Sequence, residues 1–188
     1  MREKRVRGLR RHWRDHQRQA AIPEMLSRSM IEQHQYDREK LGLSPWNVYD
    51  KPPLAFRKLW VSRLLADFQQ WHKELASFHS EFYLAVWLFE PRFGQSQLVA
   101  GISERKTRYE GIFSEAENTP LPVEYQELPG VAALRWVRHA EVEAFWADEF
   151  AERGTWASSK PHWEFKTLDG ETCIAVQVGW VWVGQAPE

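Results

Sequence analysis

The chain has a single cysteine among its 188 residues, and it has no long apolar run. One thiol cannot form an intrachain disulfide, so Cys173 excludes a disulfide-stapled scaffold and favours a reducing compartment. A membrane-spanning helix needs about 20 mostly apolar residues, and the N-terminal segment is basic rather than apolar. We therefore expect a cytoplasmic protein with neither a membrane helix nor a signal peptide.

An excess of one charge is also missing, because the formal net charge is only -1. The average therefore gives no sign of a polyanionic partner. Basic residues do gather between Met1 and Arg18, a segment that contains eight basic residues and only two acidic ones. Such a segment can touch nucleic acid or an anionic membrane, but a solvated basic surface is the favoured interpretation. A nucleic-acid partner is not expected.

Standard catalytic and metal-binding motifs are absent from the sequence. It contains no Gly-x-Ser-x-Gly elbow, no glycine-rich phosphate loop and no paired-cysteine zinc spacing. His12 and His16 are one helical turn apart, a spacing that metal ligands use, but no third ligand accompanies them. We expect no metal and no cofactor, and the motifs leave open whether the protein is an enzyme.

The hydrophobic periodicity changes along the chain and predicts an α+β fold. Residues 1–52 form a basic extension with a helix over 23–42, and residues 53–188 form the main domain. A helix over 53–78 carries one apolar stripe, and a second helix is predicted over 140–153. Strands are predicted in FYLAVWLFE, QSQLVAGIS, TRYEGIF, LPVEYQEL and GVAALRWVRH, and in a hairpin of HWEFKTL and ETCIAVQVGWVWVG. We expect a mainly antiparallel sheet with helices on one face.

Tryptophan is abundant, with 11 residues, and one stretch combines it with an acid. In the strand around Glu164, alternation places Trp163 and Phe165 on the face opposite the carboxylate. Large aromatic residues mostly build cores, but 11 tryptophans exceed what packing in a domain of this size needs. Aromatic walls around a carboxylate suit a lipophilic cation, because the rings attract the charge and the acid compensates it.

Residues 55–184 resemble the GyrI-like small-molecule-binding domain, which also serves as the effector-binding module of multidrug-responsive regulators. The matching stretches are FYLAVWLFEP, LVAGISERKTRYEGIF, LPVEYQELPGVAALRWVRHA, EVEAFWADEFAERG, PHWEF and the final strand IAVQVGWVWVG. The resemblance implies two joined strand–helix–strand–strand units around a concave aromatic pocket. It also implies that a glutamate in the penultimate strand meets the cationic part of the ligand, and in PHWEF this residue is Glu164.

The leading hypothesis is a stand-alone binding protein for small lipophilic, cationic, aromatic molecules. It would sequester the ligand or present it to a protein partner. Glu164 is the predicted charge partner, and the predicted walls are Tyr83, Trp87, Tyr109, Phe113, Trp136 and Trp180.

Two alternatives belong to other classes. A hydrolase of reactive electrophilic molecules would use Glu164 as acid or base, with Tyr109 or Tyr125 as a hydroxyl partner. A nucleic-acid or protein interaction module would use the basic segment from Arg2 to Arg18.

Overall fold

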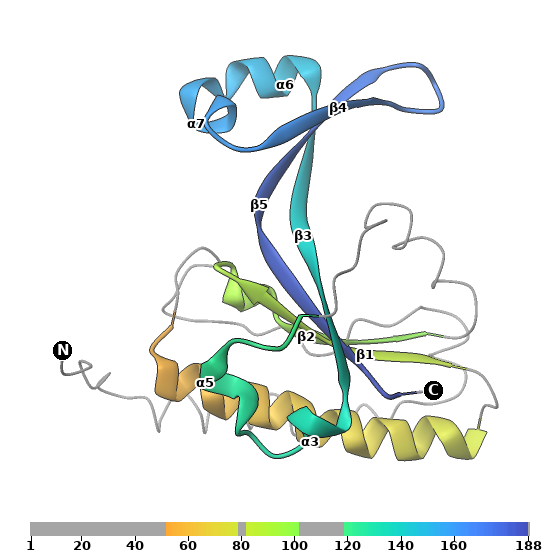
Figure 1. Cartoon of the computed structure of the whole chain (residues 1–188). Helices are drawn as coiled ribbons and strands as arrows, with labels where there is room; N and C mark the ends of the chain where they lie inside the picture. Colours follow the sequence, from red (N-terminus) through yellow and green to blue (C-terminus); the bar gives the residue numbers. More distant parts are fainter. Residues whose placement is uncertain (1–51, 79–81, 102–118, 188) are drawn as a thin grey trace.

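A computed structural model describes residues 52–78, 82–101 and 119–187 (Figure 1). Almost all of the predicted N-terminal extension lies outside these ranges, including the helix over 23–42 and the basic segment. The predicted strand TRYEGIF, with Tyr109 and Phe113, lies outside them as well. None of the helices in the described ranges is long and apolar enough to cross a membrane.

The described chain has an α+β fold built on a five-stranded antiparallel sheet, which confirms the predicted fold class. The strands are β1 (Tyr83–Glu90), β2 (Gln97–Gly101), β3 (Arg135–Trp146), β4 (His162–Lys166) and β5 (Thr172–Gln185). Four of them follow the order β2-β1-β5-β3, and β4 also pairs with β5. The predicted hairpin at Asp169-Gly170 is present, and Gly170 adopts the positive φ of 82° that its turn requires.

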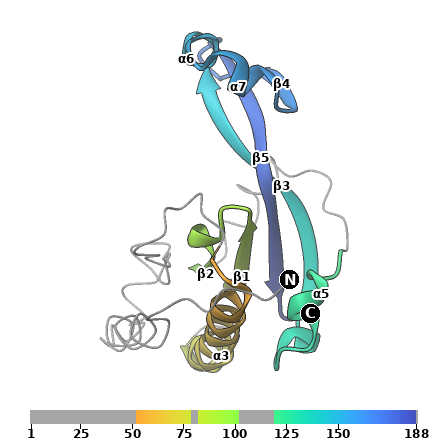
Figure 2. The ribbon, with the colours of Figure 1, turned by 90° about the vertical axis from the view of Figure 1, so that its left-hand side faces the viewer.

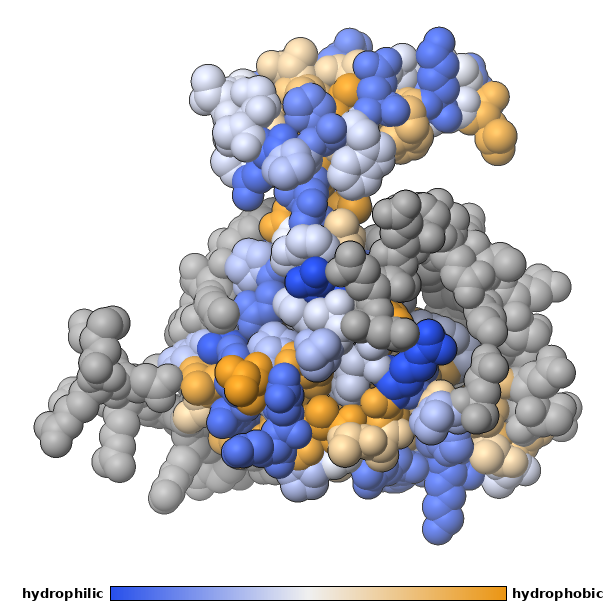
Figure 3. All heavy atoms as spheres, viewed as in Figure 1, coloured by the Kyte–Doolittle hydropathy of each residue, from blue (hydrophilic) through white to orange (hydrophobic). Residues whose placement is uncertain are grey.

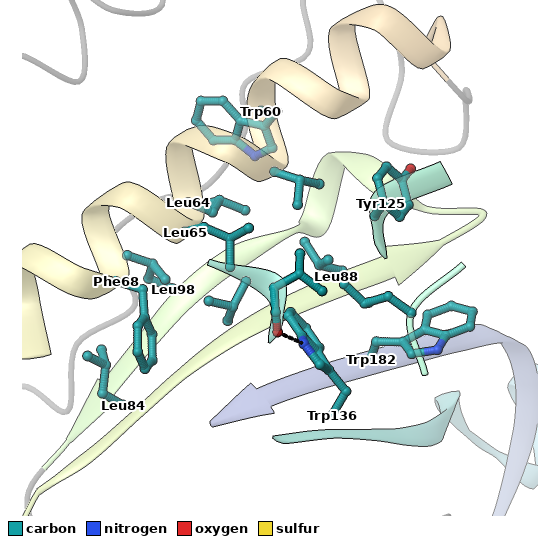
Figure 4. Packing of buried hydrophobic residues seen from close by; sticks show 14 of the residues in the cluster. Trp60, Leu64, Leu65, Phe68, Leu84, Leu88, Leu98, Tyr125, Trp136 and Trp182 are labelled. Carbon is teal, nitrogen blue, oxygen red and sulfur yellow. Dashed lines mark hydrogen bonds between the residues drawn. The ribbon is translucent and has the colours of Figure 1, made fainter. Parts of the chain in front are cut away.

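The long helix α3 (Leu54–Phe78) confirms the predicted helix over 53–78. Its apolar side chains recur every three or four residues and pack on β1 and β2 (Figure 4). Trp60 and Leu64 are fully buried there, in one cluster with Val86 and Leu98 of the sheet. Burial of this stripe fixes the helix on one face of the central strands.

Two tryptophans complete the core beneath α3. Trp136 of β3 and Trp182 of β5 belong to the same cluster as Trp60 (Figure 4). The Trp136 indole N–H donates a hydrogen bond to the Val131 carbonyl at 3.0 Å. Its ring lies directly over Gly184, where an added Cβ would come within 2.6 Å of the indole carbons. Gly184 therefore makes room for the ring.

Strands β3 and β5 are much longer than β1 and β2, and together they form a ribbon that leaves the main sheet (Figures 1 and 2). The register shifts between Glu141 and Val142, where β5 carries one extra residue. We call residues 142–177 the head, which contains β4 and the short helices α6 (Ala147–Glu152) and α7 (Gly154–Ser158). We call the remaining described residues the body, which includes α5 (Val123–Gln126), η1 (Phe93–Gln95) and η2 (Val131–Ala133).

Two predicted elements are wrong. The stretch LPVEYQEL is not a strand, because Val123–Gln126 is a short helix that begins after Pro122. The helix predicted over 140–153 is a strand as far as Trp146 and becomes helical only from Ala147. Helix α6 packs on Phe145, Ile174 and Val176 of the head, whereas α3 packs on the body, so the two helices contact different parts of the sheet.

Candidate binding site on the head

The described site residues predicted from sequence lie in several places. Tyr83 and Trp87 lie together on the sheet face opposite α3, where the Trp87 indole N–H donates to the Tyr83 hydroxyl at 3.2 Å. Trp136 lies in the core beneath α3. The ring of Trp180 instead faces the Arg138 guanidinium, whose carbon is 4.2 Å from the ring centroid.

Glu164 lies in the head, on β4, and its side chain is exposed. Its partner in β5 is Ile174, which in turn pairs with Phe145 of β3. Directly paired residues project to the same face, so Glu164 shares a face with Ile174 and Phe145. Phe150 of α6 packs on that face. The helix therefore covers the side of the head that carries the predicted charge partner.

The opposite side of the head carries three exposed aromatic side chains. Trp146 and Phe165 flank Cys173 across the three strands, and Trp163 lies beside Ala175. We call this surface the aromatic face; it consists of Trp146, Trp163 and Phe165 around Ala144, Cys173 and Ala175. The three aromatic residues are 47%, 42% and 41% exposed, whereas Cys173 and Ala175 are 6% and 3% exposed. The rings therefore cover the small residues and remain half open to solvent.

The residue types explain this arrangement. Cys173 and Ala175 of the middle strand β5 have small side chains, and the larger rings beside them keep them buried, whereas Ala144 of β3 is exposed. All six positions of the aromatic face carry uncharged side chains. Half-exposed rings gathered in one place differ from scattered apolar residues, because contiguous apolar patches on soluble proteins mark interaction sites.

The head also concentrates negative charge. Residues 142–177 contain seven acidic and three basic side chains, a net charge of -4, while the whole chain carries -1. The head stands clear of the body, and hydrophilic side chains surround its apolar ones (Figure 3). An excess of one charge around an apolar surface raises the local concentration of ligands of opposite charge. The head is thus suited to a cation.

A buried glutamate that the sequence did not single out lies where the head joins the body. An oxygen of Glu141 is 3.3 Å from Arg92, which also lies 3.5 Å from Glu143. Burial raises the pKa of the Glu141 carboxyl to about 7, although Arg92 acts in the opposite direction. Its other oxygen has no hydrogen-bond partner in the described residues and lies against Gly179, where an added Cβ would be 2.7 Å away. This carboxylate is enclosed by its own chain.

A second charged cluster joins α3 to β1 and α5. The Arg57 guanidinium lies 3.2 Å from Glu90 and 3.6 Å from Glu124, and it also donates to the Tyr125 hydroxyl. Burial raises the pKa of that hydroxyl above its ordinary value. Tyr125 thus belongs to the body, while Glu164 belongs to the head. The described structure does not place them as a catalytic pair.

The described residues contain no group of three or more His, Cys, Asp or Glu side chains that could hold a metal ion. No family model, no curated protein and no solved structure matches this chain. The GyrI-like resemblance therefore stays a prediction.

The signal for Glu141 was present in the sequence as E-V-E over 141–143, an alternation typical of a strand. The helical interpretation of 140–153 concealed it.

Proposed function

We propose that this protein binds small, flat, lipophilic cations on the aromatic face of its head, in the cytoplasm. The observation that carries the proposal is the gathering of three half-exposed aromatic residues, Trp146, Trp163 and Phe165, on a surface without charged side chains. Aromatic rings attract a cation through their π faces and a flat molecule through stacking. The net charge of -4 on residues 142–177 supports the preference for a cation.

The proposal keeps the ligand class expected from the sequence and changes which residues touch the ligand. Glu164 lies on the other face of the same strand, so it contributes to the acidic field of the head rather than contacting the ligand. The hydrolase alternative stays a prediction. Among the described carboxylates, Glu141 has the raised pKa that such an enzyme would use, but its free oxygen is packed against Gly179.

The test compares a cationic ring system with a neutral one of the same shape. N-methylacridinium and acridone are both flat and tricyclic, and calorimetric titration measures their affinities for the full chain. N-methylacridinium should bind more tightly, and its affinity should fall as salt is raised, because salt screens the acidic head. The affinity of acridone should change little with salt.

Trp163→Ala should weaken both compounds about three- to tenfold, since a stacked ring contributes roughly 1 kcal/mol. Trp156→Ala is the matched control, because Trp156 is also in the head and 46% exposed but lies on α7 and is not one of the residues of the aromatic face. Equal losses for the two variants would contradict the proposal.

Glu164→Gln distinguishes a ligand bound on the aromatic face from a ligand that contacts Glu164 directly. A ligand on the aromatic face should lose less than about twofold in affinity, through the weaker acidic field alone. A direct charged hydrogen bond contributes roughly 1.5–3 kcal/mol, so its loss would cost one to two orders of magnitude for the cation. A loss of that size would show that the ligand binds on the face that carries Glu164.

A further inference from the structure

A cavity of about 180 Å³ opens in the body, between α3 and the turn that precedes β3. One wall is a single face of the helix, formed by Leu65, Phe68, Gln69 and His72. Gly130 and Ala133 contribute to the opposite wall. This cavity is separate from the aromatic face, which belongs to the other end of the ribbon (Figure 1).

Gly130 allows the turn to approach the helix this closely. Its φ of +91° is a left-handed conformation that side chains disfavour. An added Cβ would also lie 3.2 Å from the Gln69 amide nitrogen and 3.6 Å from Leu65. The turn therefore lies against the helix without filling the space beside it.

Two polar side chains line this mostly apolar space. The His72 ring stacks on Phe68 with centroids 6.0 Å apart and meets the edge of Phe82 at 5.3 Å. Neither His72 nor Gln69 makes a side-chain hydrogen bond within the described ranges. An imidazole and an amide each offer a donor and an acceptor, so both can bind a polar group that enters the cavity.

The volume limits what can enter. An apolar cavity of about 150 Å³ is large enough for benzene, so about 180 Å³ is large enough for one substituted ring. The walls formed by Leu65 and Phe68 suit the carbon skeleton of such a ring. The His72 imidazole and the Gln69 amide can hydrogen-bond to an oxygen attached to that ring.

We propose that this cavity is a second binding site, for a single-ring phenol whose hydroxyl group hydrogen-bonds to His72. The ring lies against Leu65 and Phe68, and the hydroxyl group reaches the imidazole. The proposal is independent of the function proposed for the head.

The test uses phenol and toluene, which differ by a hydroxyl in place of a methyl group, with binding to the full chain followed by ligand-observed NMR. His72→Phe keeps the ring stacking and removes the hydrogen bond. We expect it to lower phenol affinity at least threefold and to leave toluene affinity unchanged. Equal losses for both probes, or no binding of phenol to the unmodified chain, would overturn the proposal.

Two further variants locate the site. Ala133→Leu fills the cavity and should lower the affinity of both probes at least fivefold. Ala132→Leu adds the same side chain at the adjacent exposed position, which does not line the cavity, and should have no effect. Trp163→Ala should not change the affinity for phenol, because Trp163 lies in the head and the cavity lies in the body. Equal effects of the two leucine variants, or loss of phenol binding in Trp163→Ala, would place the ligand elsewhere and refute the assignment.

Discussion

Burial and a nearby arginine shift the pKa of the Glu141 carboxyl group in opposite directions. Burial and the charge of Glu143 raise the pKa, Arg92 lowers it, and the result is a pKa of about 7. A carboxyl group in the unfolded chain titrates near 4.5. At a pH between 4.5 and about 7, the folded protein therefore keeps a proton on Glu141 that the unfolded chain has released.

This difference predicts a stability that falls with rising pH. The unfolded chain binds fewer protons at Glu141 in this window, so the free energy of unfolding decreases from about pH 4.5 to 7 and then levels off. The decrease should be roughly 3–4 kcal/mol, because the pKa rises from 4.5 to about 7 and each pKa unit corresponds to about 1.4 kcal/mol. Urea unfolding across this range should show a shallower slope for Glu141→Gln. Glu164→Gln, at an exposed glutamate, should keep the slope of the unmodified chain.

At the scale of the element, α3 is held by charge as well as by its apolar stripe. Arg57 projects from its first turns and contacts Glu90 of β1 and Tyr125 of α5, and its Nε donates to the Pro52 carbonyl at 3.0 Å. The Arg57 side chain is only 8% exposed. The position of the helix end therefore depends on a buried cation whose partners come from three other segments.

Arg57→Met should destabilise the fold by about 3 kcal/mol. The substitution preserves much of the apolar stem but leaves Glu90 largely buried without its cation, and breaking a buried ion pair costs about 3–5 kcal/mol. Lys73→Met is the control on the same helix, since Lys73 is exposed and should change stability by less than about 0.5 kcal/mol. Urea midpoints of the two variants provide the comparison, and similar midpoints would show that the Arg57 cluster contributes little.

Local patterns predicted the elements whose neighbours are near in sequence, such as α3 and the β4–β5 hairpin. They failed over 140–153, because Val142, Phe145 and Trp146 fit one side of a helix and also fit a strand. Pairing with residues 173–177 decides in favour of the strand, and that pairing joins positions about 30 residues apart. Strand alternation correctly placed Glu164 and Trp163 on opposite faces of β4. It could not reveal which of these faces α6 covers, because that depends on contacts between segments distant in the sequence.

At the scale of the whole molecule, the head and the body have separate hydrophobic clusters. The cluster beneath α3 contains 19 buried residues, whereas the cluster of the head contains three, so much less apolar surface stabilises the head. Strand β5 passes through both parts. The head should therefore open without unfolding the body.

Hydrogen exchange along β5 tests this prediction within a single strand. Amides of residues 173–177 pair with β3 in the head, and those of residues 180–184 pair with β1 and β3 in the body. We expect the first group to exchange at least about tenfold faster under native conditions. Equal protection along the strand would show that head and body unfold as one unit.

The position of β5 in the sheet also sets an order of events during synthesis. This strand pairs with β1, β3 and β4, yet it follows all of them in the chain. Until the ribosome has released residues 172–185, β1 has only β2 as a partner, and β3 has none among the described strands. Between the synthesis of β1 and that of β5, the growing chain therefore exposes open strand edges, and pairing with other chains competes with folding. Closure of the sheet must wait for β5, and it brings together segments made far apart in time.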